Sequence, residues 1–133
     1  MSEVQFSPRV RKADRWSKVI ALLIAMGVFA GSLWLTDEPQ LSSITAAGVG
    51  IGARFYIPYW ASLSVPADER VSIEEHPGAG NFHHGAAGVA LMVGSLGTVG
   101  LMLLEQNTTV ALLLGLPATG ALYFLLTELL PRG

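Results

Sequence analysis

The 133-residue chain contains no cysteine. This absence excludes a disulfide framework, a thiolate zinc site, an iron–sulfur cluster and covalently attached c-type haem. Charged residues are scarce as well: they make up 14% of the chain, whereas a soluble domain has about 25%. The net charge of −2 does not suit a basic nucleic-acid-binding domain. No P-loop, dinucleotide fingerprint, G-x-S-x-G or H-E-x-x-H motif is present, and we expect neither an enzyme nor a cofactor.

The main feature of the sequence is a series of long runs without charged residues. Apolar residues make up 51% of the chain, and its mean hydropathy is +0.50. A helix needs about 20 apolar residues to cross the roughly 30 Å hydrocarbon core of a membrane. The apolar residues run continuously instead of alternating, which argues against a transmembrane β-barrel. The pattern predicts an all-α membrane protein, a four-helix bundle of two transmembrane hairpins with spans at about 18–36, 40–62, 84–104 and 108–130.

The connections between the spans predict the topology. Asp37-Glu38-Pro39 and Glu105-Gln106-Asn107 are short turns, and 63–83 is the one long loop. Apart from Arg54, every Lys and Arg falls on the side of the termini and the long loop, so the positive-inside rule places that side in the cytoplasm or an equivalent interior. We therefore divide the chain into a basic interior N-terminal arm (1–17), a membrane domain (18–130) and a tail (131–133). A signal peptide over residues 1–35 is the alternative.

Small residues recur within each predicted span, at spacings that place them on one helix face. Lipid tails are as apolar as leucine, so helices in a bilayer associate through close packing at such residues. We expect them to form the helix contacts of a compact bundle, with a further face for contacts between copies of the chain. The residues are Gly27, Gly31, Gly48, Gly52, Ala87, Ala90, Gly94, Gly97, Ala111 and Gly115.

Arg54 is the single charge deep within a predicted span, where a charge suggests a functional site. Three interpretations stay open. In the first, the side chain extends to the interior headgroups beside an aromatic belt that begins at Phe55. In the second, it pairs with Glu128, expected at the same depth in the fourth span. In the third, it serves a transport or gating step.

The N-terminal arm and three histidines are the remaining candidates for a site. The arm acts as a topology signal, contacts anionic lipid or, less in keeping with the composition, contacts nucleic acid; its basic residues are Arg9, Arg11, Lys12, Arg15 and Lys18. Histidines beside Glu74 and Glu75 could hold a transition metal, with surface histidines in a polar loop as the alternative; they are His76, His83 and His84.

Three functions fit these features: a structural membrane protein, an accessory subunit of a membrane complex, and a small oligomeric channel or holin-like protein. Two Lys against six Arg, no Cys and an acidic loop suit a high-GC or a halophilic source, and the second is the one we follow. In length, four spans and short outer turns, the chain resembles the small membrane protein of haloarchaeal pleomorphic viruses (the pleolipoviruses). That resemblance implies an archaeal-virus envelope protein, embedded in the virion membrane and facing mainly inward beside a separate spike protein. The partners we expect are the bilayer, further copies of the chain and a spike or other membrane protein.

Overall fold

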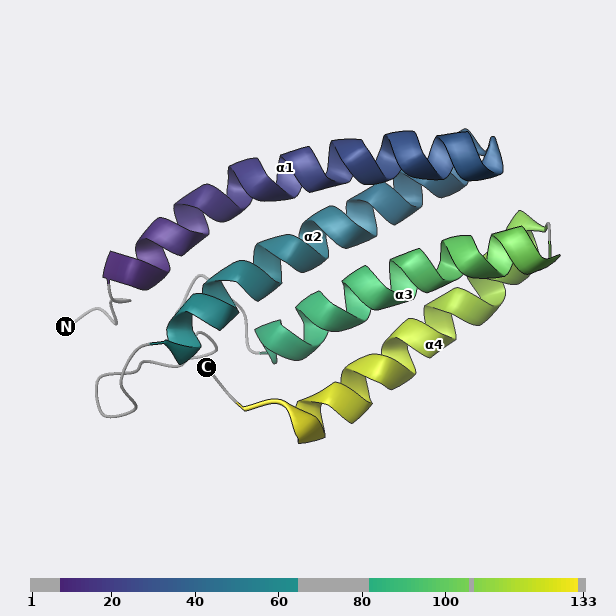
Figure 1. Ribbon diagram of the computed structural model, residues 1–133. Coiled ribbons are helices and arrows are strands. Elements are labelled where there is room, and N and C mark those ends of the chain that lie inside the picture. The colour runs from purple at the N-terminus through teal and green to yellow at the C-terminus, as the bar shows by residue number, and fades with distance from the viewer. Residues whose placement is uncertain (1–7, 65–81, 106, 132–133) are drawn as a thin grey trace.

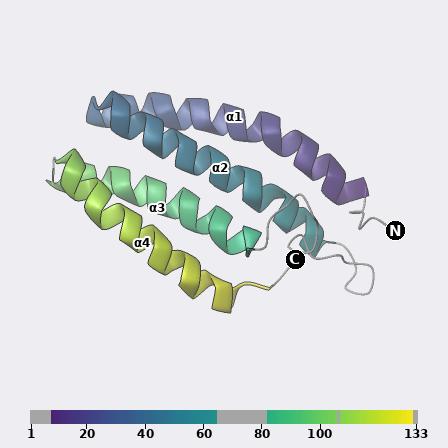
Figure 2. The same cartoon turned by 180° about the vertical axis from the view of Figure 1, so that it is seen from behind.

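A computed structural model describes residues 8–64, 82–105 and 107–131. Four helices make up this part of the chain: α1 (Pro8–Thr36), α2 (Pro39–Leu63), α3 (His84–Glu105) and α4 (Thr108–Leu129). They run side by side (Figure 1), and the view from behind shows the same arrangement (Figure 2). The predicted all-helical bundle is therefore confirmed.

The helices form an open row instead of a closed ring. α1 packs on α2, α2 on α3 and α3 on α4, with a small contact between α1 and α3. α2 and α3 are therefore the inner helices, and α1 and α4 are the edges. At one end, called here the turn end, short connections follow α1 and α3. At the other, called the loop end, α1 and α3 begin while α2 and α4 finish.

Three helices, α1, α3 and α4, are long and apolar enough to cross a membrane, and α2 is not among them. Its composition follows from its position, because its neighbours on two sides are protein and not lipid. Leu41, Ser42 and Thr45 are almost completely buried, as are Val49 and Ala53 further along. Polar residues of membrane helices face the bundle interior, so a helix between two others can carry serine, threonine and glycine where an edge helix carries leucine.

α1 begins ten residues before the predicted first span. It runs unbroken from Pro8 to Thr36, about 43 Å at 1.5 Å per residue, which exceeds the hydrocarbon thickness. Residues 8–17 are its first turns, and Val10 and Ser17 there are buried. Residues 8–17 of the predicted arm are therefore helical and continuous with the first span, and residues 1–7 lie outside the described part.

The turn between α1 and α2 contains two residues. Asp37 has a φ of 53°, the left-handed conformation that ends many helices and that Asp tolerates better than most residues. Its N–H donates to the Leu33 carbonyl at 2.8 Å. Glu38 is extended, and Pro39 opens α2 at a position where a missing N–H costs nothing. These three residues reverse the chain as the sequence predicts.

Glycines create the closest contacts between helices. A Cβ on Gly52 of α2 would lie 2.7 Å from the Gly88 carbonyl oxygen of α3, and a Cβ on Gly88 would lie 2.7 Å from the Gly52 carbonyl oxygen. Gly48 contacts Ser95 in the same seam, while Gly50 faces Ala25 of α1. α2 thus uses glycines two residues apart to approach both of its neighbours, and of the three only Gly48 and Gly52 are predicted from the sequence.

The predicted packing residues divide into two groups. In the seam between α3 and α4, Gly94 faces Thr119, and Gly115 faces Thr98. Ala90 and Ala111 are buried as expected, and Ala87 is half-buried. The prediction is wrong within this chain for three glycines, beside which an added Cβ would meet nothing within 4 Å: Gly27, Gly31 and Gly97. Gly27 and Gly31 lie on a side of α1 that faces away from the bundle. Small residues recur on more than one side of that helix, so their spacing does not indicate which side packs.

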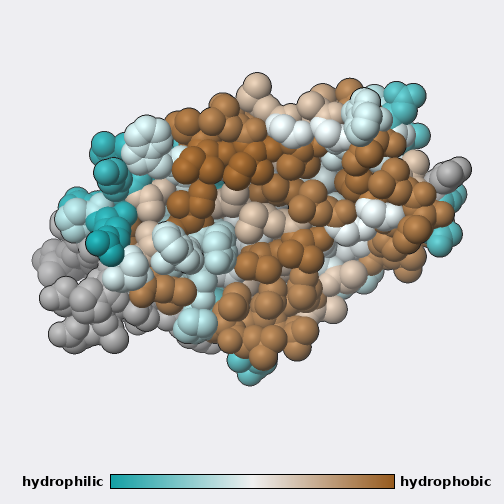
Figure 3. All heavy atoms as spheres, in the orientation of Figure 1, coloured by the Kyte–Doolittle hydropathy of each residue, from teal (hydrophilic) through white to brown (hydrophobic). Residues whose placement is uncertain are grey.

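The surface is apolar over the middle of the bundle. Figure 3 shows hydrophobic residues along the length of the visible face, with hydrophilic residues gathered toward its two ends. The edge helices supply much of this surface: Leu22, Leu23 and Met26 of α1 and Leu113, Leu116 and Phe124 of α4 are each at least 60% exposed. Such a band suits a lipid environment and would be costly in water.

Substitution of Gly88 tests the closest contact. Gly88→Ala should lower the free energy of unfolding by about 1–3 kcal/mol, because backbone atoms of Gly52 and Tyr56 lie within about 3 Å of the added Cβ and cannot move away. Gly97→Ala on the same helix is the matched control, since its Cβ enters open space. Thermal unfolding in detergent, followed by helical circular dichroism, measures both. Equal effects would contradict the assigned seam.

Candidate functional site

Apart from Thr108, whose hydroxyl donates to Met102 Sδ at the turn end, the described polar side chains that link different helices gather at the loop end, in two clusters. One joins α1 to α2 through two arginines, and the other joins α2, α3 and the end of α4 through a histidine and a tyrosine. The turn end carries acidic groups instead, at Asp37, Glu38 and Glu105. The described cations therefore all lie toward one end of the bundle.

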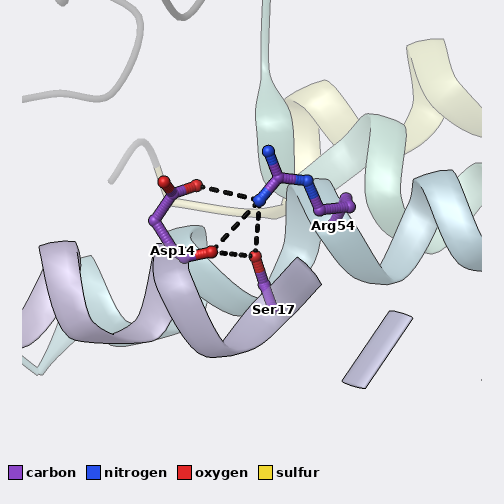
Figure 4. A network of polar contacts seen from close by, with 3 residues as sticks. All are labelled: Asp14, Ser17 and Arg54. Carbon is purple, nitrogen blue, oxygen red and sulfur yellow. Dashed lines mark hydrogen bonds and ion pairs between the residues drawn. The ribbon is translucent and has the colours of Figure 1, made fainter. Parts of the chain in front are cut away.

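The arginine cluster centres on one nitrogen atom. Arg54 Nη1 donates to Ser17 Oγ at 2.9 Å and to the Asp14 carbonyl oxygen at 3.1 Å, and it lies 3.3 Å from Asp14 Oδ1 (Figure 4). Ser17 Oγ in turn donates to the Asp14 carbonyl at 2.6 Å. Nη1 has two hydrogens for three acceptors, so one hydrogen is shared. The guanidinium thus ties α2 to the first turns of α1.

This ion pair replaces the predicted pairing of Arg54 with Glu128. Asp14 is the partner, while Glu128 lies exposed on α4, which packs on α3 and not on α2. Asp14 is not predicted as this partner, because the charges of residues 1–17 indicate an arm outside the bundle. One signal in the sequence points to this contact: helical spacing places Val10, Asp14 and Ser17 on one face. In the structure that face packs against the bundle, and Val10 and Ser17 are buried.

A second arginine joins the same two helices. Arg9 Nη1 donates to Ser64 Oγ at 3.1 Å, and Ser64 is the C-cap of α2. A cation at the C-terminal end of a helix is favourable because the last carbonyls carry partial negative charge. Of the predicted basic residues, this leaves four that are exposed on α1 and that form no ion pair among the described residues: Arg11, Lys12, Arg15 and Lys18.

His83 joins α3 to the end of α4. Its Nδ1 accepts a hydrogen bond from the Ala86 N–H at 3.1 Å, and its carbonyl accepts the first helical bond, from Ala87. It is thus the N-cap of α3. Because Nδ1 accepts, the neutral ring carries its proton on Nε2, which donates to the Leu130 carbonyl at 3.1 Å. One imidazole therefore caps one helix and fixes the end of another.

Aromatic rings surround this histidine. Tyr59 of α2 donates its hydroxyl hydrogen to the Pro131 carbonyl, and its ring centroid lies 5.5 Å from that of His83. His84 stacks on Phe82 at 4.1 Å between centroids, and Phe55 meets both rings edge-on. The cluster therefore closes the loop end of α2, α3 and α4 with rings instead of charged groups.

The histidines do not behave as predicted. His83 and His84 are 4% and 6% exposed, so the interpretation as surface histidines is wrong for both, and His83 caps α3. His76 lies outside the described residues. Within the described part, no three His, Cys, Asp or Glu side chains come together as metal ligands do. What the sequence does not display is the return of the chain after α4, whose Leu130 carbonyl meets the His83 ring, and the packing of Phe82 and Phe55 on the His84 ring.

Comparisons of the chain with protein-family models, with curated proteins and with solved structures find no match. The geometry of the bundle therefore carries the functional argument.

A double-mutant cycle tests the arginine cluster. Arg54→Gln should lower the free energy of unfolding by about 1 kcal/mol, and its coupling to Asp14→Asn should stay below about 1 kcal/mol, since side chains 38% and 52% exposed are screened. Glu128→Gln is the control and should show no coupling to Arg54→Gln. Thermal unfolding in detergent of the wild type, the three single variants and the two double variants gives these energies. Coupling of Arg54 to Glu128, with none to Asp14, would contradict the observed ion pair and support the predicted pairing of Arg54 with Glu128.

Two substitutions of His83 separate its two roles. His83→Asn keeps an oxygen that can cap α3 but is too short to reach Leu130, whereas His83→Ala loses both contacts. We expect the free energy of unfolding to be highest for the wild type, lower for His83→Asn and lowest for His83→Ala. Each lost contact should lower it by about 1 kcal/mol. Hydrogen exchange should rise at the last amides of α4 in both variants. Equal stability of the two variants would show that the cap contributes nothing.

Proposed function

We propose that this protein is a non-enzymatic structural membrane protein that fills and organises a lipid bilayer from its inner side. The observation that carries the proposal is the exposed apolar surface of the two edge helices. Large side chains of α1 and α4 point away from the bundle over the whole uncharged length between its ends. A surface of this kind is stable where the surrounding solvent is lipid.

Tryptophan positions support a bilayer of ordinary thickness. Trp16 and Trp34 are both exposed on α1, and 18 residues of helix separate them, about 27 Å at 1.5 Å per residue. Tryptophan is enriched at both membrane interfaces, and the hydrocarbon core between them is about 30 Å thick. In this arrangement Arg54 and Asp14 lie at the inner headgroups, which favours the interpretation that Arg54 extends to the interface over a gating charge.

The interior of the bundle gives little support to a channel. The polar residues of α2 that could line a pore are Ser42, Ser43 and Thr45. Ser42 and Thr45 are buried against protein, and the Ser43 hydroxyl donates to the Pro39 carbonyl of its own helix. A pore needs polar groups on an open face, so these residues fit helix packing better than conduction.

The envelope of an archaeal virus is the membrane we propose. The turn between α1 and α2 contains two residues, so little of this hairpin projects outward, and the positive-inside rule predicts an inward orientation for the termini and the long loop. The resemblance to the pleolipovirus membrane protein in length and spans points the same way. In such an envelope, a spike protein would supply the outer surface that this chain lacks.

Abundance in purified particles tests this function. Density-gradient separation of enveloped particles from host membranes, with quantitative mass spectrometry of both fractions, should find the protein in the particles at a copy number near that of the main surface protein. A structural role requires many copies, because each covers a small area of membrane. Retention in cell membranes at a fixed ratio to a larger complex would instead identify an accessory subunit.

A further inference from the structure

We propose that the loop end of α1 binds the phosphate groups of anionic lipids through a basic stripe, defined as Arg11, Lys12, Arg15 and Lys18. This inference rests on the proposed insertion of the bundle in a membrane. It assigns a ligand class to a segment that is otherwise a topology signal.

The stripe is held in place by the fold. All four residues are exposed and helical, and Arg11, Arg15 and Lys18 follow the i, i+4, i+7 spacing of one helix face. They span about 10 Å along the axis. Two contacts to α2 fix these turns of α1, one through Arg9 and one through Arg54. The cations are therefore presented together by a docked helix, with little ordering left to occur on binding.

The depth of the stripe matches lipid headgroups. Trp16, on the same turns, is 54% exposed, and the exposed apolar residues Val19 and Ile20 follow Lys18 directly. The change from cations to lipid-facing side chains therefore takes place within one helical turn. Lipid phosphates lie at this boundary, and long basic side chains extend toward them.

The local charge favours an anion. Asp14 is the one acidic residue of α1, and its carboxylate is paired with Arg54. Arg9 is engaged at Ser64. Within the described residues, none of the four cations of the stripe forms an ion pair, which leaves their charge available to an external anion. Position at the membrane boundary makes lipid phosphate the favoured source over nucleic-acid phosphate.

Lipid titration of the full chain tests the inference. Native mass spectrometry in detergent, with phosphatidylglycerol or phosphatidylcholine added, measures the selectivity of the wild type and of Arg11→Gln/Arg15→Gln/Lys18→Gln. We expect preferential phosphatidylglycerol binding in the wild type and at least a tenfold loss in the triple variant, because each cation near an anionic surface contributes about fivefold. Arg11→Lys/Arg15→Lys/Lys18→Arg keeps the charge and should retain the selectivity.

Single substitutions sharpen the assignment. Arg15→Gln should weaken phosphatidylglycerol binding about fivefold, whereas Arg9→Gln should change it less, because the Arg9 guanidinium is engaged at Ser64. Equal affinity of the wild type for both lipids, or an unchanged triple variant, would overturn the inference. So would tighter binding of a single-stranded oligonucleotide than of phosphatidylglycerol, with sensitivity to the same substitutions.

Cysteine labelling separates this inference from the proposed function. The native chain lacks cysteine, so Glu38→Cys and Ser64→Cys can each be labelled alone with a membrane-impermeant maleimide in vesicles. Labelling from opposite sides together with lipid selectivity supports both proposals. Labelling of the two cysteines from opposite sides, without selectivity for phosphatidylglycerol, overturns the lipid site alone. Equal labelling of both cysteines from one side overturns the membrane arrangement on which both proposals depend.

Discussion

The close approach of α2 to α3 at Gly52 and Gly88 is the constraint on which the rest of the bundle depends. In lipid, apolar side chains gain little by leaving the solvent, so helices associate through contacts at short range. The two glycines let one backbone lie against the other, with no room for a Cβ on either side. Every larger side chain along this seam packs at a separation that these two residues set.

The order of the helices follows from this seam. An inner helix can carry small and polar residues because protein surrounds it, and α2 does so at Ser42 and Thr45. An edge helix must present apolar side chains to lipid, as α1 and α4 do. The one helix that is not apolar enough to span a membrane therefore lies inside the row, and the helices that expose many large apolar side chains lie at its margins. A soluble bundle has the reverse arrangement, with its apolar residues in the interior.

The two ends of the row differ in how they are held together. At the turn end, the chain reverses within the two residues Asp37 and Glu38. At the loop end, the helix ends are far apart in sequence, and side chains must join them: Arg54 reaches Asp14, and His83 reaches Leu130. Arg54, together with Arg9 at Ser64, holds the basic first turns of α1 against α2, whereas His83 holds the end of α4 against α3.

The positions of α2, α3 and α4 and the end of α1 could be predicted from the sequence alone, because the cost of burying charge in lipid limits each span to an uncharged run and the turn residues mark its ends. The start of α1 could not, since the helix continues through the charged residues that precede the uncharged run. Polar contacts between helices could not. Asp14 lies in a segment whose charges suggest an arm, yet helix continuation brings it to Arg54; His83 looks exposed beside a polar loop, yet Tyr59 and the chain after α4 bury it. The side of each helix on which small residues pack could not be predicted either. Gly31 and Gly52 each end a G-x-x-x-G pair, yet Gly31 faces away from the bundle while Gly52 packs against α3. Spacing along one helix determines which residues share a face, whereas tertiary packing alone decides what that face meets.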